Sequence, residues 1–254
     1  AAHMALIRGA FYYMGQSKID LLVLGLPVNT FEKYNQQLAE RVIGKHLVPV
    51  REKDGSLSQR EVEVSNCRVI PQPIGAFFDY ATKTRTYDRM RSQMNLLIDI
   101  GYYTLDWLVA DGVKMVNARS GAHNGGMSAV LRSMAEAIGS EIGEQISDLS
   151  MLEESIRTGI DPTFYGKPFD ITEHLKIGKA KAEQFVSVLV NKVGSALDIS
   201  NIILAGGGAE FFKDVLADKF PKHEIITTSD PVFANVRGFH RAGQQFADQI
   251  FKRG

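Results

Sequence analysis

The chain has 254 residues, 44% of them hydrophobic, which is enough to bury a sizeable core in one or two domains. Its 29 basic and 29 acidic residues balance, and no run of lysine and arginine predicts direct binding to nucleic acid or to a membrane. The apolar stretches are too short to cross a bilayer, nothing at the N-terminus resembles a signal peptide, and the histidines lack metal-ligand spacing. A lone cysteine, Cys67, excludes an internal disulfide and favours a reducing, cytoplasmic location; we interpret it as a small strand residue.

The first third of the chain is predicted to alternate strands with helices. Residues 1–4 (Ala-Ala-His-Met) look like a cloning remnant and belong to no predicted element. Thr30 is predicted to cap a helix, because the apolar residues that follow it then fall on one face, namely Phe31, Tyr34, Leu38 and Val42. The other elements predicted here are a continuous apolar strand at 19–24, a hairpin of 46–51 and 60–69 around Asp54-Gly55, and a strand that turns into a helix at 71–76.

A polar stretch, 83–93, has no strand pattern and is predicted to cross between two domains. Strands and helices alternate after it, which is typical of an α/β protein with layered sheets. The predicted elements are a three-strand meander at 96–119, a turn-rich loop at 121–126, helices at 127–146 and 149–158, a loop at 159–170, a long helix at 172–197, a strand at 201–205, a helix at 210–220, a strand at 224–227 and a last helix from about Asn235.

The most informative segment is the start of the meander, where an apolar run ends in Asp99 and is followed by Gly101, Thr104 and Asp106. This D-x-G-x-x-T-x-D pattern predicts a tight turn whose backbone N–H groups point outward, and Gly101 allows an anion to approach closely. Carboxylates do not bind phosphate themselves, but Asp99 and Asp106 can hold the water shell of a Mg²⁺ ion that does. The pattern is short, so a plain β-turn with solvated aspartates explains it equally well when it is taken alone.

Two further corners of the chain favour a phosphate site. Gln72 lies where a strand turns into a helix, and an amide at that point can orient an attacking water without acting as a strong base. Simple hydrogen bonding at the helix end is the better explanation of Gln72 when its segment is taken alone. Farther along, Gly206-Gly207-Gly208 joins a strand to a helix in a geometry that suits a phosphate or an adenosine on the backbone, although such turns are common.

The order of these motifs, with the Gln corner first, then D-x-G-x-x-T-x-D and then the three glycines, is that of the actin-like nucleotide-binding fold. The chain resembles the bacterial actin-like ATPases of plasmid segregation, the ParM/StbA group, and within it the branch called PRTRC protein D. The resemblance covers nearly the whole chain from Ile19 onward. The segments that support it are 22–28 (Leu-Val-Leu-Gly-Leu-Pro-Val), 72–76 (Gln-Pro-Ile-Gly-Ala), 124–127 (Asn-Gly-Gly-Met) and 230–238 (Asp-Pro-Val-Phe-Ala-Asn-Val-Arg-Gly).

The resemblance implies roles for particular residues around ATP or ADP and Mg²⁺. Gln72 and Asp99 are the implied catalytic residues: Gln72 positions the attacking water, and Asp99, together with Asp106, positions the metal through water. The residues expected to contact the nucleotide are Gly101, Tyr102, Thr104 and Asp106 at the phosphates, Gly206, Gly207 and Gly208 at the adenosine, and Phe211 at the base. Arg157 would reach the ribose in one interpretation, whereas a solvated helix face is the better-supported one.

The chain departs from the family in one respect. Family members begin with a D-x-G-x-x-x-x-K strand-turn-strand, the first phosphate loop, which has no counterpart in this sequence. The predicted strand 19–24 matches a later strand of the first domain, and the small insertion subdomain that usually precedes that strand also has no counterpart. The implied fold is therefore the actin/Hsp70/sugar-kinase (ribonuclease H-like) two-domain fold with an incomplete first domain. Its expected parts are a remnant of the first domain at 1–94, the second domain at 95–235, and a C-terminal helix at 236–254 that returns to the first.

The resemblance further implies an ATPase that polymerises into filaments with Mg-ATP and segregates plasmid DNA through a DNA-binding adaptor. This chain is expected to bind ATP weakly and to hydrolyse it little, because only one phosphate loop is evident. It is also expected to expose a strand edge at 19–24, which invites pairing with a second copy. The alternatives are a non-catalytic nucleotide- or partner-binding domain, and a phosphotransferase like the sugar and acetate kinases, for which no acceptor motif is evident.

Overall fold

A computed structural model describes the backbone of residues 2–251 and the side chains of residues 4–250. The chain forms two compact units: unit 1 contains Ala1–Leu26, Thr30–Pro71 and Phe239–Gly254, and unit 2 contains Pro27–Asn29 and Gln72–Gly238. The sequence placed the first domain boundary after residue 94. That domain assignment stays a prediction; the first compact unit leaves the chain after Pro71, and the helix that follows packs on the sheet of unit 2.

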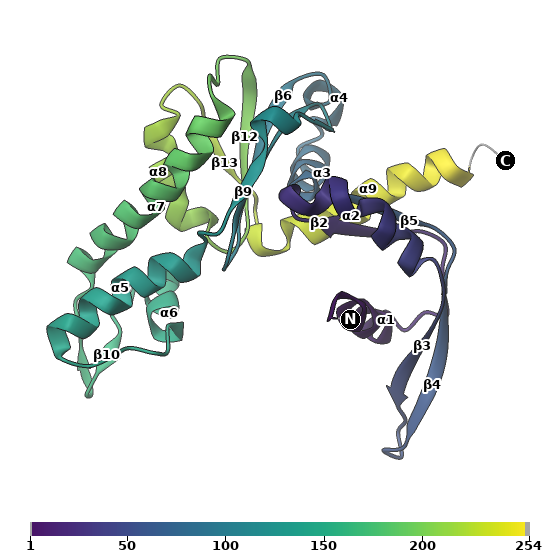
Figure 1. The fold of residues 1–254 in the computed structure, drawn as a ribbon, viewed down its shortest axis with the longest axis horizontal. Helices are drawn as coiled ribbons and strands as arrows, with labels where there is room; N and C mark the ends of the chain where they lie inside the picture. The colour runs from purple at the N-terminus through teal and green to yellow at the C-terminus, as the bar shows by residue number, and fades with distance from the viewer. Residues whose placement is uncertain (1, 252–254) are drawn as a thin grey trace. The chain divides into compact units, whose positions relative to one another are not determined.

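Unit 1 begins with a helix, α1, that the sequence prediction omitted. This helix lies beside a β-hairpin (Figure 1), and the Arg60 guanidinium of the hairpin donates to the carbonyl oxygens of Phe11 and Tyr12 at the helix end. Residues 2–4, which the sequence prediction assigned to no element, are the first residues of this helix. The elements of unit 1 are α1 (Ala2–Met14), β1 (Lys18–Ile19), β2 (Leu22–Leu26), most of α2 (Val28–Val42), β3 (Gly44–Arg51), β4 (Leu57–Val64), β5 (Cys67–Pro71) and the end of α9 (Ala234–Phe251).

The strands of unit 1 form two small sheets. The hairpin predicted around Asp54-Gly55 is confirmed as β3 and β4. The expected hairpin arm 60–69 is divided into β4 and β5, and the expected strand 19–24 is divided as well. The expected strand 19–24 divides into β1, which pairs with β4, and β2, which pairs with β5. Asn66 causes this break, since it donates to the Asp20 carbonyl and accepts from the Leu22 N–H. The helix α2 begins at Val28, two residues before the predicted cap.

Cys67, at the start of β5, is a strand residue as predicted. Burial raises the pKa of its thiol to about 11, so the thiol is protonated and a poor nucleophile at neutral pH.

Unit 2 is built on one sheet with the strand order β13-β12-β6-β7-β8, and β9 also pairs with β7. The strand β12 runs parallel to both β13 and β6, whereas β6, β7, β8 and β9 form antiparallel pairs, as the predicted meander requires. The strands are β6 (Met94–Ile100), β7 (Leu105–Asp111), β8 (Lys114–Met115), β9 (Gly121–His123), β12 (Ile199–Ala205) and β13 (Ile225–Thr227), with a separate hairpin of β10 (Thr163–Phe164) and β11 (Lys167–Pro168).

Helices cover both faces of this sheet. On one face α5 and α7 lie side by side (Figure 1) and share a core with alternate residues of β6, such as Leu96, Ile98 and Ile100. On the other face α3 contacts β6 and β12. The helical elements are α3 (Ile74–Lys83), α4 (Tyr87–Met90), η1 (Asn117–Arg119), α5 (Met127–Ile142), α6 (Ser150–Thr158), α7 (Thr172–Val193), α8 (Ala209–Lys219), η2 (Pro231–Phe233) and the start of α9.

Several predicted boundaries in unit 2 were wrong for local reasons. The polar stretch 83–93 contains α4, whose Tyr87 ring stacks on Phe78 at 5.8 Å between centroids. The loop 121–126 contains β9, and the loop 159–170 contains the β10–β11 hairpin. The helices α5 and α7 end earlier than predicted, because Gly143 and Gly194 adopt positive φ angles of 77° and 69°.

None of the helices in the described part of the chain combines the length and hydropathy needed to cross a bilayer.

The helix α1 can be tested at Gly9, in its middle. A Cβ at Gly9 would meet nothing within 4 Å. Gly9→Ala should therefore stabilise the chain by about 0.5–1 kcal/mol, since alanine loses less conformational entropy in a helix. Gly15→Ala is the matched control: the site is equally open, but its φ of +68° makes alanine strained and destabilising. Urea unfolding followed by circular dichroism measures both; a destabilised Gly9→Ala variant would contradict the helix.

Candidate functional site

Two buried carboxylates face each other at one end of the unit 2 sheet. Asp99 and Asp106 are direct partners in the antiparallel register of β6 and β7, and only 5% and 4% of their surfaces are exposed. Because side chains alternate along a strand, Asp99 points away from the core that Ile98 and Ile100 enter, toward the face that α3 covers. Like charges directly opposite each other destabilise a strand pair, so this arrangement needs compensation.

Two amide side chains supply part of this compensation. The Nε2 group of Gln72 donates to Asp99 Oδ2 at 2.7 Å, and the Nδ2 group of Asn235 donates to the same oxygen at 2.8 Å. Asn235 Oδ1 in turn accepts the Ala76 N–H at 3.1 Å, at the start of α3. The structure thus brings Gln72 and Asp99 together as the sequence predicted, and it adds Asn235, for which no role was predicted.

The electrostatics of the pair favour a bound cation. Burial, and secondly the charge of Asp106, raise the pKa of Asp99 to about 6, although the hydrogen bonds from Gln72 and Asn235 act in the opposite direction. Burial also raises the pKa of Asp106, against hydrogen bonds from the Thr104 hydroxyl and the Val28 N–H. A cation placed here would offset the energetic cost of burying the two ionised carboxylates, which is the cost that raises their pKa values.

The turn between β6 and β7 leaves several backbone donors free. The Gly101 N–H closes the turn on the Thr104 carbonyl at 2.9 Å, while the Met127 and Ser128 N–H groups at the start of α5 bind the Gly101 and Tyr102 carbonyls. Among the described residues, the N–H groups of Tyr102, Tyr103 and Thr104 have no acceptor. These N–H groups are available to an anion, and their contact with phosphate stays a prediction.

The three glycines follow β12, next to β6, but they serve different purposes. Gly206 has a φ of +86°, and a Cβ there would lie 2.3 Å from the Ile100 carbonyl oxygen and 2.5 Å from Asp99 Oδ1. Gly208 donates to the same carbonyl at 2.9 Å, and a Cβ on it would lie 2.4 Å from the Ile100 side chain. Gly207 is exposed and faces open space, since a Cβ there would meet only Val232, at 3.9 Å. Packing therefore explains Gly206 and Gly208 but not Gly207.

Phe211, one turn into α8, lines a cavity of about 390 Å³ between α6, α7 and α8. Other residues of the wall are Ser155 and Ile156 from α6, and Thr172 and Leu175 from α7. The Phe211 ring is half-buried beside this cavity, and its contact with a nucleotide base stays a prediction. Arg157 pairs with Glu154 on an exposed helix face, which is the better-supported of its two predicted roles.

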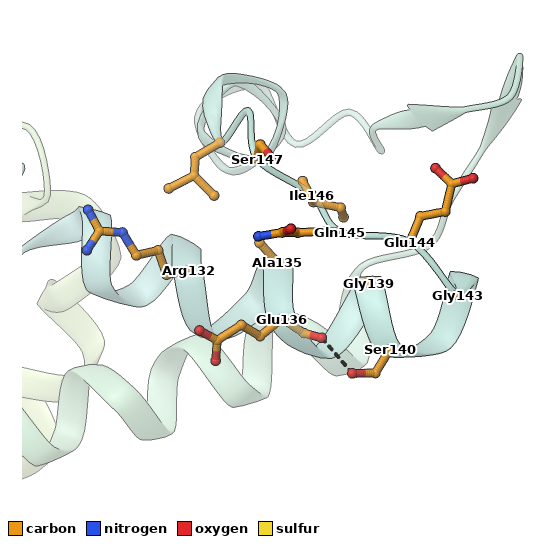
Figure 2. Close-up of a pocket in the computed structure, with 11 residues that line it drawn as sticks. Arg132, Ala135, Glu136, Gly139, Ser140, Gly143, Glu144, Gln145, Ile146 and Ser147 are labelled. Atoms are coloured by element: carbon orange, nitrogen blue, oxygen red, sulfur yellow. Dashed lines mark hydrogen bonds between the residues drawn. The ribbon is translucent and has the colours of Figure 1, made fainter.

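A larger cavity of about 800 Å³ lies between α5 and the segment that follows it. Figure 2 shows Arg132 and Glu136 of α5 on one side and Gln145 on the returning segment, with the Ser140 hydroxyl bound to the Glu136 carbonyl at 2.9 Å. The chain turns back at Gly143, and this turn forms the cavity between the helix and the segment that follows. It contains none of the predicted site residues.

The residues present suit a hydrated Mg²⁺ ion rather than one enclosed by protein. In the described part of the chain no three His, Cys, Asp or Glu side chains converge on one point. Oδ1 of Asp99 accepts no hydrogen bond from a described residue, and the backbone of Gly206 packs closely beside this oxygen. Magnesium usually keeps several waters and takes one or two carboxylates, as Asp99 and Asp106 offer.

Comparisons with known protein families match two parts of the chain. Residues 1–75 match the model described as "Actin like proteins N terminal domain", and residues 97–218 match "Archaeal actin homologue MreB-like, C-terminal". The first match begins at residue 1, so it includes the residues that the sequence prediction set aside. No curated protein matches the chain significantly.

Solved structures show the fold. The archaeal actin homolog Ta0583 superposes with a TM-score of 0.79 at 19% identity, over 95% of this chain and 76% of that one, and its complex with ADP gives 0.78 at 19%, over 95% and 77%. The actin-like protein Alp7A gives 0.70 at 16%, over 93% and 70%. The 15-stranded ParM filament from Clostridium botulinum gives 0.67 at 23%, over 88% and 66%. The chain therefore has the actin-like fold, as predicted.

The glycine loop can be tested by a matched pair of variants. Gly207→Ala should leave the free energy of unfolding unchanged within about 0.5 kcal/mol, because its Cβ enters open space. If ADP lies on this loop, the same change should reduce the thermal stabilisation that Mg-ADP gives. Gly206→Ala should instead destabilise the free chain by roughly 2 kcal/mol or more, through its positive φ and its contact with Ile100. Thermal unfolding of both variants with and without Mg-ADP separates an effect on nucleotide binding from an effect on folding. If Mg-ADP stabilises Gly207→Ala as much as wild type, the nucleotide does not lie on this loop.

Asp99 should make the metal-free chain less stable as the pH rises. Its pKa of about 6 when folded exceeds the ordinary 3.8, so the folded state binds more protons between these values and loses stability as the pH rises through them. Asp99→Asn keeps an oxygen for both amide donors but has no charge to bury. With chelator present it should be more stable than wild type at pH 8, by at most about 3 kcal/mol, and by much less at pH 4. A variant less stable than wild type at pH 8 would contradict the burial cost.

Proposed function

We propose that this chain binds Mg²⁺-ATP and hydrolyses it at the turn that ends in Asp106. The observation that supports this most strongly is the buried Asp99–Asp106 pair beside unpaired backbone N–H groups of the described β6–β7 turn. Buried acidic pairs are costly, and a site that attracts a cation and a phosphate chain together explains why one is retained here. The fold and the ADP complex of the archaeal actin homolog also favour a nucleotide.

In this proposal each group has one task. Bound Mg²⁺ neutralises phosphate charge and lets the γ-phosphate accept water in line. Asp99 and Asp106 hold the water shell of the metal, and the free N–H groups of the turn bind phosphate oxygens. Gln72 orients the attacking water through its Oε1 atom, which accepts no hydrogen bond from any described residue. The glycines at 206–208 hold the adenosine, and Phe211 contacts the base from the cavity beside it.

We further propose that the protein forms filaments, in the cytoplasm, and that the two units correspond to the two domains of the fold. The structures named ParM and described as filaments favour self-association. Plasmid segregation through a DNA-binding adaptor is the finer form of this proposal, and it rests on the sequence resemblance. Negative-stain electron microscopy with Mg-ATP tests polymerisation; filaments that need nucleotide are expected.

Two other functions predict different results. A phosphotransferase would release little inorganic phosphate under either condition, and would form ADP and a phosphorylated product only when a sugar or carboxylate acceptor is added. A non-catalytic binding domain would take up nucleotide in calorimetry without releasing phosphate. Phosphate release by wild type therefore identifies a hydrolase, and ADP formation with and without the acceptor separates the other two. Asp99→Ala is the control, because removal of one charge-positioning group typically costs about 10²–10³ in rate.

Gln72→Ala should slow hydrolysis while nucleotide affinity stays close to wild type. Water positioning acts in the transition state and contributes little to ground-state binding. We expect single-turnover rates to fall at least about tenfold, with the ADP dissociation constant changed less than about threefold, so filaments should persist longer in ATP. A large rise in the dissociation constant with unchanged turnover would show that Gln72 serves binding instead.

A further inference from the structure

Asn235 and Gln72 bind the same oxygen of Asp99, but they are held very differently. Asn235 is fixed at both ends, since its Nδ2 donates to Asp99 at 2.8 Å and its Oδ1 accepts the Ala76 N–H at 3.1 Å. Gln72 is fixed at one end only, by the 2.7 Å bond from Nε2 to Asp99. A side chain held at one end can change partners at the cost of a single hydrogen bond, whereas one held at both ends cannot.

The backbone around Asn235 is also fixed against α3. A Cβ added to Gly75 would lie 2.4 Å from the Asn235 carbonyl oxygen, and one added to Gly238 would lie 1.7 Å from the Gly75 carbonyl oxygen. The first turn of α9 therefore lies directly on the first turn of α3. Arg237 strengthens the same contact, because its guanidinium pairs with the fully buried Asp79 of α3 and with Asp230.

We propose that Asn235 is a positioning residue for Asp99: it keeps the carboxylate in place on α3 and α9, so that Gln72 is free to leave Asp99 and bind the attacking water. The inference rests on the proposed function, since it assigns Asp99 to the hydrated metal and Gln72 to the water. It adds that Asn235 keeps Asp99 Oδ2 bonded when the Gln72 side chain turns toward the attacking water. Asn235 then holds Asp99 while the metal and nucleotide are bound.

The chain offers a matched control for this role. Asn235→Ala removes both hydrogen bonds to Asp99 and Ala76. Arg237→Ala weakens the same α9–α3 contact at Asp79 but does not touch Asp99. Both variants should unfold at a lower temperature than wild type, so a merely structural role for Asn235 predicts that they behave alike in every other measurement.

The first measurement is the Mg²⁺ dependence of phosphate release in the full chain. Asn235→Ala should raise the Mg²⁺ concentration for half-maximal rate and lower kcat, each by about 10- to 100-fold, as is typical when a group that orients a metal-binding side chain is lost. The KM for ATP should change less than about threefold. Arg237→Ala should keep the Mg²⁺ dependence of wild type. An Asn235→Ala variant with wild-type Mg²⁺ dependence would overturn the inference.

The second measurement needs no turnover. The side-chain amide signals of Gln72 and Asn235, assigned in ¹⁵N-labelled protein by Gln72→Ala and Asn235→Ala, report their hydrogen bonds directly. On addition of Mg-ADP with beryllium fluoride, the Gln72 signal should shift and the Asn235 signal should stay. If the Asn235 signal moves and the Gln72 signal does not, the inference is wrong. If calorimetry detects no Mg-nucleotide binding by wild type, the proposed function fails, and this inference fails with it.

Discussion

The arrangement of unit 2 depends on the placement of two carboxylates opposite each other at the end of β6 and β7. The antiparallel register makes Asp99 and Asp106 neighbours, and burial makes their charges expensive. Each surrounding feature lowers that cost or leaves room for a counter-charge. The amides of Gln72, just before α3, and of Asn235 in α9 donate to Asp99 Oδ2, and the Thr104 hydroxyl and the Val28 N–H bind Asp106. Asp99 Oδ1 accepts no hydrogen bond from a described residue. A sheet selected for stability alone would place apolar residues at these positions.

Close backbone contacts make this arrangement rigid. Gly75 and Gly238 let the first turns of α3 and α9 touch, and Gly206 and Gly208 let the loop after β12 lie on the end of β6. In each case a side chain would push apart two segments whose separation sets the positions of Asp99, Gln72 and Asn235. These glycines thus determine the geometry of the site although none of them supplies a reacting group.

The sequence predicted the local parts of the site better than the distant ones. Asp99 and Asp106 were recognised because strand alternation and a short turn place them together. Asn235 was not assigned a role, since its partner Asp99 lies 136 residues away and nothing in the local pattern of a helix start reveals such a contact. The break in the strand expected at 19–24 was missed for the same reason. At the break Asp20 contacts Asn66, which lies far along the chain, after β4. The segment 230–238 supported the family resemblance, but only the structure shows that its Asn235 contacts Ala76 of α3 and Asp99.

The boundaries between the two compact units do not all fall in loops. One lies after Asn29, inside α2, and another lies after Gly238, inside α9, so single helices contribute residues to both units. The chain therefore cannot be divided into its two compact units without cutting a helix. A cut at either point would divide a helix, and a cut after Gly238 would leave Asn235 at the frayed end of a five-residue stub. Limited proteolysis, which needs unwound backbone, should find few entry points there. Dissection of this protein into separately expressed halves would therefore expose a cut helix end three residues from Asn235, which holds Asp99.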